Sequence, residues 1–217
     1  MDDTLVESTV NYGKFKGLVI ERLVSWGQDR ASYSSEETIV AILSRYELRM
    51  RAAGMSEKEL ASRLSELDKI MDDVEMERVT ETKAIAGSGK LLRMLRAKGI
   101  RIGILTRGCE DYAETVLSVT DMLNLVDSIE CRNSKTKAKP NPESYLKLVA
   151  ALGVDKDQTI FVGDHPIDAQ CAANAGVRFV AVRTGDVADE LLREVGSIEV
   201  FADVGEMVSW FEELLSD

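Results

Sequence analysis

Histidine and cysteine are scarce in this 217-residue sequence, and each scarcity excludes a class of site. With His165 as the single histidine, no Ser-His-Asp set can be assembled, and its place in a strand-to-helix turn favours a surface residue over a catalytic base. The three cysteines, Cys109, Cys131 and Cys171, lie far apart with no CxxC pair. That spacing predicts reduced thiols in a cytoplasmic protein and argues against a structural zinc.

Long apolar runs and excess positive charge are also missing. No apolar run approaches the ~18 residues of a membrane span, so we expect no membrane. The 38 acidic residues outnumber the 27 basic ones, and the net charge of -11 argues against nucleic acid or an anionic membrane as the main partner. A small phosphorylated substrate stays compatible, because a bound cation and a few basic groups can reverse the sign inside a pocket.

The stretch of about residues 12–85 is helical in pattern, and nothing in it indicates a strand. Apolar residues recur at 3.6-residue spacing from Phe15 to Trp26. Residues 34–37 resemble the start of a second helix, and residues 56–59 match a capping box that starts a third. We expect a fourth helix over residues 74–85. The simplest interpretation of this stretch is a helical bundle.

From residue 86 onward, strand and helix patterns alternate. We predict strands at 100–105, 126–131, 159–162, 178–182 and 198–201, and helices at 90–97, 110–117, 143–152, 169–175, 187–195 and 204–215. Such alternation implies a parallel sheet with right-handed crossovers. The expected fold class is therefore α/β, with a Rossmann-like parallel-sheet core of residues 1–12 and 86–217 and an inserted helical cap of residues 13–85.

Two carboxylates follow the predicted strand at 159–162. Gly163 allows a sharp turn, Asp164 can cap the next helix, and Pro166 suits its first turn. Asp164 and Asp168 thus lie at the carboxyl end of a strand, where ligands of open α/β sheets bind. Oxygen ligands of this kind suit Mg²⁺. An N-cap aspartate followed by a solvated acid would give the same pattern.

Three more polar residues lie at predicted strand ends or in stiffened loops. Thr106 and Arg107 follow the strand at 100–105 and could hold an oxyanion, although a turn residue and a surface arginine would look alike. Lys139 precedes a Pro-Asn-Pro segment. Because proline stiffens the loop, the ammonium group of Lys139 would be held in one direction. It could equally be one more lysine in a loop that already carries Lys135 and Lys137.

With these residues, the sequence resembles the haloacid dehalogenase-like (HAD) hydrolase superfamily along nearly its whole length. Four motifs occur in the family's order: Asp2-Asp-Thr-Leu-Val6, Ile104-Leu-Thr106, Lys139-Pro-Asn-Pro142 and Gly163-Asp-His-Pro-Ile-Asp168, with Ala172, Ala175 and Gly176 after the last. The helical stretch between the first two motifs is similar to the cap of the helical-cap phosphatases, the subgroup that includes phosphoglycolate phosphatase and β-phosphoglucomutase.

The resemblance implies a role for each matching residue. Asp2 corresponds to the general acid/base, whose backbone carbonyl also faces Mg²⁺. Thr106 corresponds to the hydroxyl that holds the transferring phosphoryl group, with Arg107 beside it, and Lys139 to the lysine that neutralises nucleophile and phosphate. Asp164 corresponds to a direct metal ligand and Asp168 to the acid that supports it.

One element of the family pattern has no counterpart. The nucleophilic aspartate stands two residues before the position of Asp2, which would precede Met1, and the strand that leads into it is missing as well. Making Asp2 the nucleophile would put Thr4 in the acid/base position and spoil the match. We interpret Met1 as an internal methionine of a longer product, and we expect the 217-residue form to be inactive and to leave a groove where a central strand belongs.

The sequence therefore predicts a cytoplasmic, Mg²⁺-dependent phosphatase of a small phosphorylated metabolite that acts through an aspartyl-phosphate. A phosphosugar mutase or a dehalogenase is the alternative among enzymes. A non-catalytic protein that uses the same fold to bind a ligand or partner is the alternative from another class. Neither the substrate nor the oligomeric state can be read from the residues.

Overall fold

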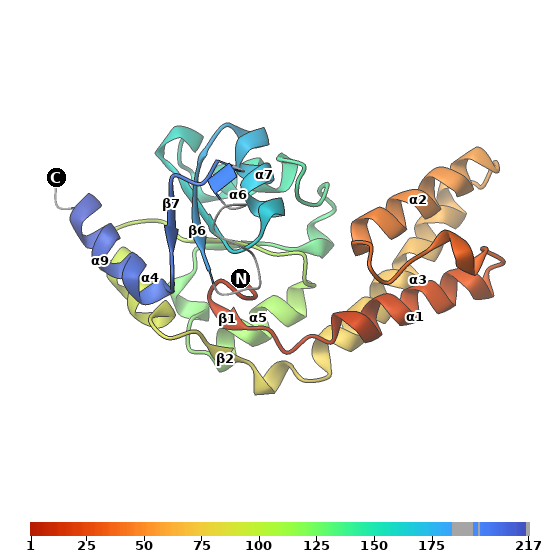
Figure 1. The fold of residues 1–217 in the computed structure, drawn as a ribbon, viewed down its shortest axis with the longest axis horizontal. Coiled ribbons are helices and arrows are strands. Elements are labelled where there is room, and N and C mark those ends of the chain that lie inside the picture. The colour runs from red at the N-terminus through yellow and green to blue at the C-terminus, as the bar shows by residue number, and fades with distance from the viewer. Residues whose placement is uncertain (184–192, 195, 216–217) are drawn as a thin grey trace. The chain divides into compact units, whose positions relative to one another are not determined.

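The computed structural model describes residues 1–183, 193–194 and 196–215 of the chain. By their internal contacts these residues form two compact units, Thr9–Val79 and Met1–Ser8 with Thr80–Asp217. Both are drawn in Figure 1. None of the helices described here is both long and apolar enough to cross a bilayer.

The unit Thr9–Val79 is built from α1 (Tyr12–Ser25), α2 (Ile39–Ala52) and α3 (Glu57–Met76). Each helix starts at a capping side chain: Asn11, Thr38 and Ser56 accept hydrogen bonds from the backbone amides of Lys14, Ala41 and Glu59. The apolar faces of the helices meet in one core of fully buried side chains, which includes Val19, Leu23, Ile42, Tyr46 and Leu67. The periodicity at 12–26 is thus confirmed as a buried helix face.

Two expectations for residues 34–85 are wrong. The second helix begins at Ile39 rather than near residue 34, because the Glu37 carboxylate accepts from the Ser34 amide and holds those residues in a turn. No fourth helix covers 74–85: α3 runs on to Met76, a 3₁₀ turn follows, and β2 (Lys83–Ala84) pairs antiparallel with β1 (Val6–Glu7). Pairing with a strand some 80 residues away overrides the local helical pattern here.

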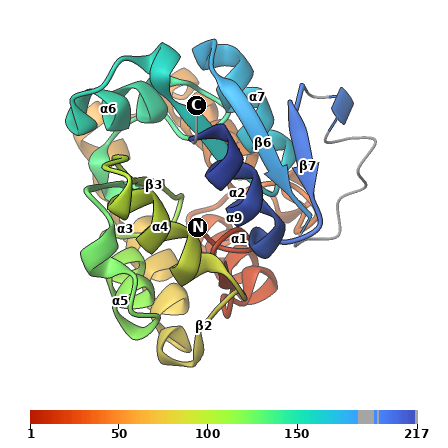
Figure 2. The same cartoon turned by 90° about the vertical axis from the view of Figure 1, so that its left-hand side faces the viewer.

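The α/β fold class is confirmed in the other unit, whose main strands are all parallel. β3 (Gly103–Leu105) pairs with β4 (Ser128–Glu130), and β5 (Ile160–Gly163), β6 (Arg178–Val182) and β7 (Glu199–Phe201) form a second sheet in that order. Within the described chain, β3 and β5 each pair along one edge only. Figures 1 and 2 show β6 and β7 running side by side.

Helices connect these strands as the sequence predicts. They are α4 (Ser88–Ala97), α5 (Glu110–Val119), α6 (Glu143–Leu152), α7 (Pro166–Ala175) and α9 (Val204–Leu214). The ends of α6 and β6 are confirmed to the residue, whereas β3 is shorter than expected because the Asp127 carboxylate, not a strand, accepts from the Ile102 amide. The helix expected at 187–195 falls mainly on residues outside those described.

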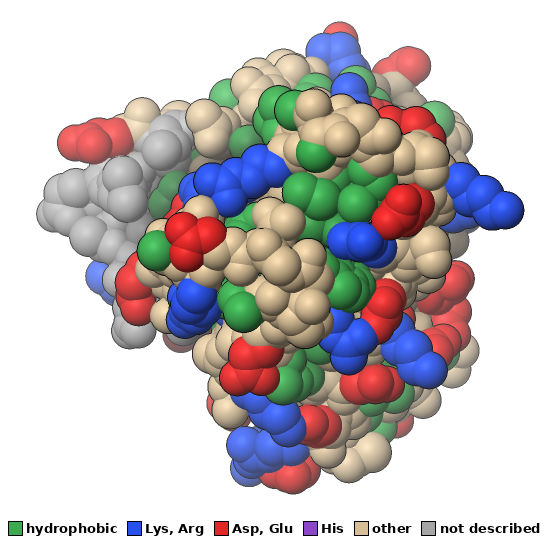
Figure 3. Space-filling model, turned by 90° about the vertical axis from the view of Figure 1, so that its right-hand side faces the viewer, with side chains coloured by type: hydrophobic (Ala, Val, Ile, Leu, Met, Phe, Trp, Pro, Cys, Tyr) green, Lys and Arg blue, Asp and Glu red, His purple; other side chains and the backbone are tan. Residues whose placement is uncertain are grey.

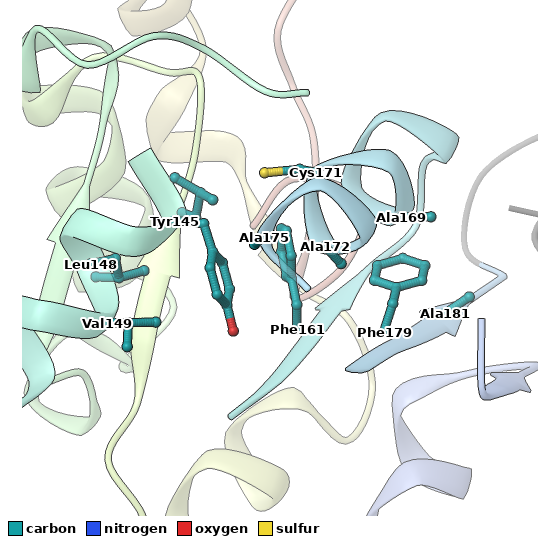
Figure 4. Close-up of a cluster of buried hydrophobic side chains, with 11 residues drawn as sticks. Tyr145, Leu148, Val149, Phe161, Ala169, Cys171, Ala172, Ala175, Phe179 and Ala181 are labelled. Carbon is teal, nitrogen blue, oxygen red and sulfur yellow. The ribbon is translucent and has the colours of Figure 1, made fainter. Parts of the chain in front are cut away.

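One apolar core joins the two sheets. Leu105 from β3, Tyr145 and Leu148 from α6, and Phe161 from β5 belong to the same buried cluster, which extends to the alanines of α7. Figure 4 shows the rings of Tyr145, Phe161 and Phe179 between α6, α7 and β6, and the first two rings stack with centroids 5.1 Å apart. This cluster fixes β5 and α7, and with them the loop that carries Asp164 and Asp168.

Candidate active site

The chain begins with a tight turn that carries Asp2 and Thr4. The carbonyl oxygen of Met1 accepts hydrogen bonds from the amides of Thr4 and Leu5, and the Asp3 amide donates to the Val6 carbonyl. Asp3 takes a positive φ of 52° to close the turn. Asp2 forms a parallel bridge with Val6. Backbone hydrogen bonds therefore hold these residues in one conformation.

Thr4 connects this turn to the loop after β5. Its buried hydroxyl donates to Oδ1 of Asp164 over 2.6 Å, and the backbone carbonyl oxygen of Asp2 lies 3.4 Å from the same hydroxyl. A main-chain oxygen of Asp2 and a carboxylate oxygen of Asp164 thus face one point, although the two residues are far apart in sequence. No local pattern indicates the role of Thr4.

Burial raises the pKa of the Asp164 carboxyl, the nearby Asp168 carboxylate raises it further, and the Thr4 hydrogen bond opposes the rise. Asp164 is therefore a carboxylate whose negative charge the surrounding protein does not fully compensate. A bound cation would supply the missing compensation. The oxygen-only donor set of Asp2, Asp164 and Asp168 matches the preference of hard divalent cations.

Lys139 and Asp168 form a buried ion pair next to Asp164. The Lys139 Nζ lies 2.5 Å from Oδ1 of Asp168, and both side chains are at most 10% exposed. Burial alone would raise the pKa of Asp168, but the Lys139 ammonium outweighs it and the pKa is lowered. The Lys-Pro-Asn-Pro segment and the helix after β5, read separately in the sequence, thus meet at this pair.

Gly163 leaves room for the Asp168 side chain. A Cβ at position 163 would lie 2.7 Å from Cβ and 2.8 Å from Oδ2 of Asp168. In contrast, a Cβ at Gly17 inside α1 would meet nothing within 4 Å. The two glycines therefore form a matched pair for substitution.

We expect Gly163→Ala to destabilise the protein by about 1–3 kcal/mol, because the methyl group must push Asp168 away from Lys139. Gly17→Ala should instead stabilise it by about 0.5–1 kcal/mol, since alanine favours a helix interior. Urea denaturation measures both changes. Equal effects of the two substitutions would contradict the steric role of Gly163.

Thr106 and Arg107 follow β3, as the sequence predicts, in a loop held by backbone contacts. The Thr106 amide donates to the Glu130 carbonyl over 3.0 Å, and its hydroxyl accepts from the Gly108 amide over 3.1 Å. Nη1 of Arg107 is buried and has no hydrogen-bond partner among the described residues. A buried guanidinium nitrogen without an acceptor is costly, so a hydrogen-bond acceptor beside it would be stabilising.

His165, not Asp164, caps α7, so the expectation that Asp164 caps this helix is wrong. Nδ1 of His165 accepts from the Ile167 amide over 3.2 Å, and Asp168 closes a reciprocal capping box by accepting from the His165 amide over 3.3 Å. The Asp164 carboxylate is left to interact with Thr4. His165 is exposed, in line with its interpretation as a surface residue.

The three cysteines are free and buried. Cys171 lies on α7, and its thiol is 3.5 Å from the Asn141 carbonyl oxygen. Burial raises the pKa of this thiol to about 11, with Lys139 opposing the rise. Cys171 is therefore protonated at neutral pH and is a poor nucleophile despite its position near Lys139.

Two site contacts come from residues that the sequence did not single out. The hydroxyl of Tyr112 on α5 donates to Oδ1 of Asp2 over 2.5 Å. Glu130 at the end of β4 is buried and accepts from Thr136 over 2.7 Å, which holds the loop that leads to Lys139. Tyr112 looks like an ordinary apolar position of a helix, and Glu130 like a strand-end acid, so neither offered a signal.

The match to a family model identifies the class of this protein. Residues 1–182 match the model described as haloacid dehalogenase-like hydrolase, and the chain belongs to that family.

Curated relatives are named as phosphatases of small molecules. The chain is 32% identical over 124 residues to phosphoglycolate phosphatase from Rhodospirillum rubrum, a match that covers 57% of this chain and 51% of the relative. It is 32% identical over 107 residues to validoxylamine A 7′-phosphate phosphatase from Streptomyces hygroscopicus subsp. limoneus, covering 49% and 50%. The matches thus span about half the length of these relatives.

Solved structures share the fold over nearly the entire chain. A hydrolase from Pseudomonas syringae superposes with a TM-score of 0.66 at 17% identity and covers 98% of this chain and 95% of the other. A HAD family hydrolase from Deinococcus radiodurans R1, solved with bound phosphate and sodium, gives a TM-score of 0.62 at 19% identity and covers 99% and 94%. At these identities the likeness establishes the fold.

Proposed function

We propose that this protein is a Mg²⁺-dependent, cytoplasmic phosphatase that hydrolyses a small phosphorylated metabolite through an aspartyl-phosphate intermediate. The observation that carries the proposal is the meeting of Asp2, Thr4 and Asp164 beside the Lys139–Asp168 pair, at the carboxyl end of β5. Membership of the family and the phosphatase names of the relatives support it.

Oxygen atoms would hold the cation. The Asp164 carboxylate and the Asp2 carbonyl would be direct ligands, and Asp168 would support them from its pair with Lys139. When bound, Mg²⁺ would neutralise negative charge on the phosphoryl oxygens. The raised pKa of Asp164 supports this assignment, because a buried acid beside a second acid gains most from a cation.

The remaining residues would act on the phosphoryl group and its protons. Lys139 supplies a fixed positive charge, and the Thr106 hydroxyl and the unpaired Nη1 of Arg107 supply hydrogen-bond donors for its oxygens. Asp2 would protonate the leaving alkoxide and later take a proton from the attacking water. Splitting the hydrolysis at an aspartyl-phosphate replaces one difficult step by two easier ones.

The attacking aspartate would stand two residues before Asp2, and the 217 residues hold no such position.

The composition and the face drawn in Figure 3 favour a small substrate over a polyanion. The net charge is -11. On the face drawn in Figure 3, acidic and basic side chains alternate with hydrophobic ones, and neither sign gathers into one large patch. A nucleic-acid backbone would require an extended basic surface.

Release of phosphate from p-nitrophenyl phosphate tests the proposal. We expect the full-length gene product to hydrolyse this ester with Mg²⁺ and to lose the activity in EDTA. Hydrolysis that survives EDTA would contradict the metal dependence. Retention of phosphate on a sugar phosphate would indicate a mutase, and binding of Mg²⁺ or phosphate without turnover would indicate a non-catalytic ligand-binding protein.

A further inference from the structure

Tyr112 on α5 is in direct contact with the carboxylate of Asp2. Its hydroxyl donates to Oδ1 of Asp2 over 2.5 Å, and the tyrosine is 1% exposed. A phenol at this depth is fixed by its packing and holds its hydrogen bond in one direction. The hydrogen bond therefore fixes the direction of the Asp2 carboxylate.

The ring of Tyr112 also contacts the loop that carries Thr106. A Cβ at Gly108 would lie 2.7 Å from Cδ1 of Tyr112, so only glycine leaves space for the ring there. The Gly108 amide in turn donates to the Thr106 hydroxyl. One buried side chain thus ties the Asp2 turn to the loop after β3.

We propose that Tyr112 is a positioning residue that orients Asp2 for proton transfer; this role rests on the proposed phosphatase function. The phenol fixes the rotamer of the carboxylate by its hydrogen bond. It also keeps the carboxylate in register with Thr106, which would hold the phosphoryl group beside the leaving oxygen that Asp2 protonates. Prearranged dipoles of this kind avoid reorganisation during the reaction.

Tyr112→Phe in the full-length gene product tests this role, because it removes only the hydroxyl. We expect kcat to fall about 10–100-fold, as for loss of one hydrogen bond to a charged group, with KM changed less than about twofold. Tyr145→Phe is the matched control: it removes another buried phenol hydroxyl, 2.6 Å from the Thr159 hydroxyl and without a contact to Asp2. Its kcat should stay within about twofold of the wild type.

A double-mutant cycle separates positioning from mere folding. In an Asp2→Asn background, Tyr112→Phe should change kcat less than about twofold, because its effect passes through the carboxylate. Equal loss in both backgrounds, or equal loss for Tyr145→Phe, overturns the role. If Tyr112→Phe does not fold, ¹⁹F spectra of 3-fluorotyrosine-labelled protein decide: Asp2→Asn should shift the Tyr112 resonance, and an unmoved resonance overturns the contact.

The same experiment keeps the two proposals apart. An active wild type whose Tyr112→Phe variant is equally active refutes the role of Tyr112 and leaves the phosphatase function standing. A wild type that hydrolyses no phosphomonoester refutes the phosphatase function, and the role of Tyr112 falls with it.

Discussion

Asp164→Asn is expected to lower Mg²⁺-dependent hydrolysis by the full-length gene product about 10²–10³-fold, since the metal supplies several kcal/mol to the transition state. The substitution replaces the carboxylate of the proposed ligand by a neutral amide of the same size. Mg²⁺ at about 100 times its Kd should raise the Tm of the wild type by about 5–10 °C. The same addition should leave the variant unchanged.

Without metal, we expect Asp164→Asn to stabilise the fold. Burial raises the pKa of Asp164, so ionisation of this group destabilises the fold, and the loss grows as pH rises from its unfolded pKa through its folded pKa. At neutral pH and in EDTA, Asp164→Asn should therefore melt at a higher temperature than the wild type. Asp157→Asn, an exposed control, should alter neither metal binding nor activity. A variant that melts lower in EDTA and still binds Mg²⁺ would refute the metal-ligand assignment.

Lys139→Met should lower the free energy of unfolding by about 3–5 kcal/mol, because it leaves the Asp168 carboxylate buried without its cation. Lys156→Met removes a lysine whose ion pair with Asp157 is largely exposed, and it should cost no more than about 1 kcal/mol. Urea denaturation at neutral pH measures both. Similar costs for the two lysines would contradict the buried pair.

The pH dependence gives a second check on this pair. Burial works to raise the pKa of Asp168, but Lys139 lowers it overall, so the pair stabilises the fold above the unfolded pKa of an aspartate and this contribution is lost as pH falls through the folded pKa. The difference in stability between the wild type and Lys139→Met should therefore shrink under acidic conditions. A difference that stays constant down to strongly acidic pH would contradict the electrostatic origin.

The candidate site residues that lie at strand ends could be predicted from the sequence. The strand at 160–163 and the turn after it placed Asp164 and Asp168 at a sheet edge, and the Lys-Pro-Asn-Pro segment pointed to Lys139. Strand ends are readable because apolar runs stop where polar side chains begin. The contacts between these side chains could not be predicted. The sequence did not show which oxygen of Asp168 contacts Lys139, nor that Asp164 interacts with Thr4 instead of capping α7.

The strand β2 and the contact of Tyr112 were missed for one physical reason, which is contact between distant segments. β2 has a helical pattern but forms a strand because β1 lies beside it. Tyr112 is an apolar helix position by spacing, and only the folded chain brings its hydroxyl to Asp2, 110 residues away in sequence. Periodicity reports which face of an element is buried and does not report what that face meets.

The most direct test is a crystal structure of the protein soaked in Mn²⁺ as a stand-in for Mg²⁺, with an anomalous difference map to locate the ion. We expect one strong peak within ligand distance of an Asp164 carboxylate oxygen and the Asp2 carbonyl oxygen, with Lys139 and Thr106 facing the same space. A peak elsewhere on the molecule, with none beside Asp164 at saturating Mn²⁺, would contradict the proposed metal site and the phosphatase mechanism built on it.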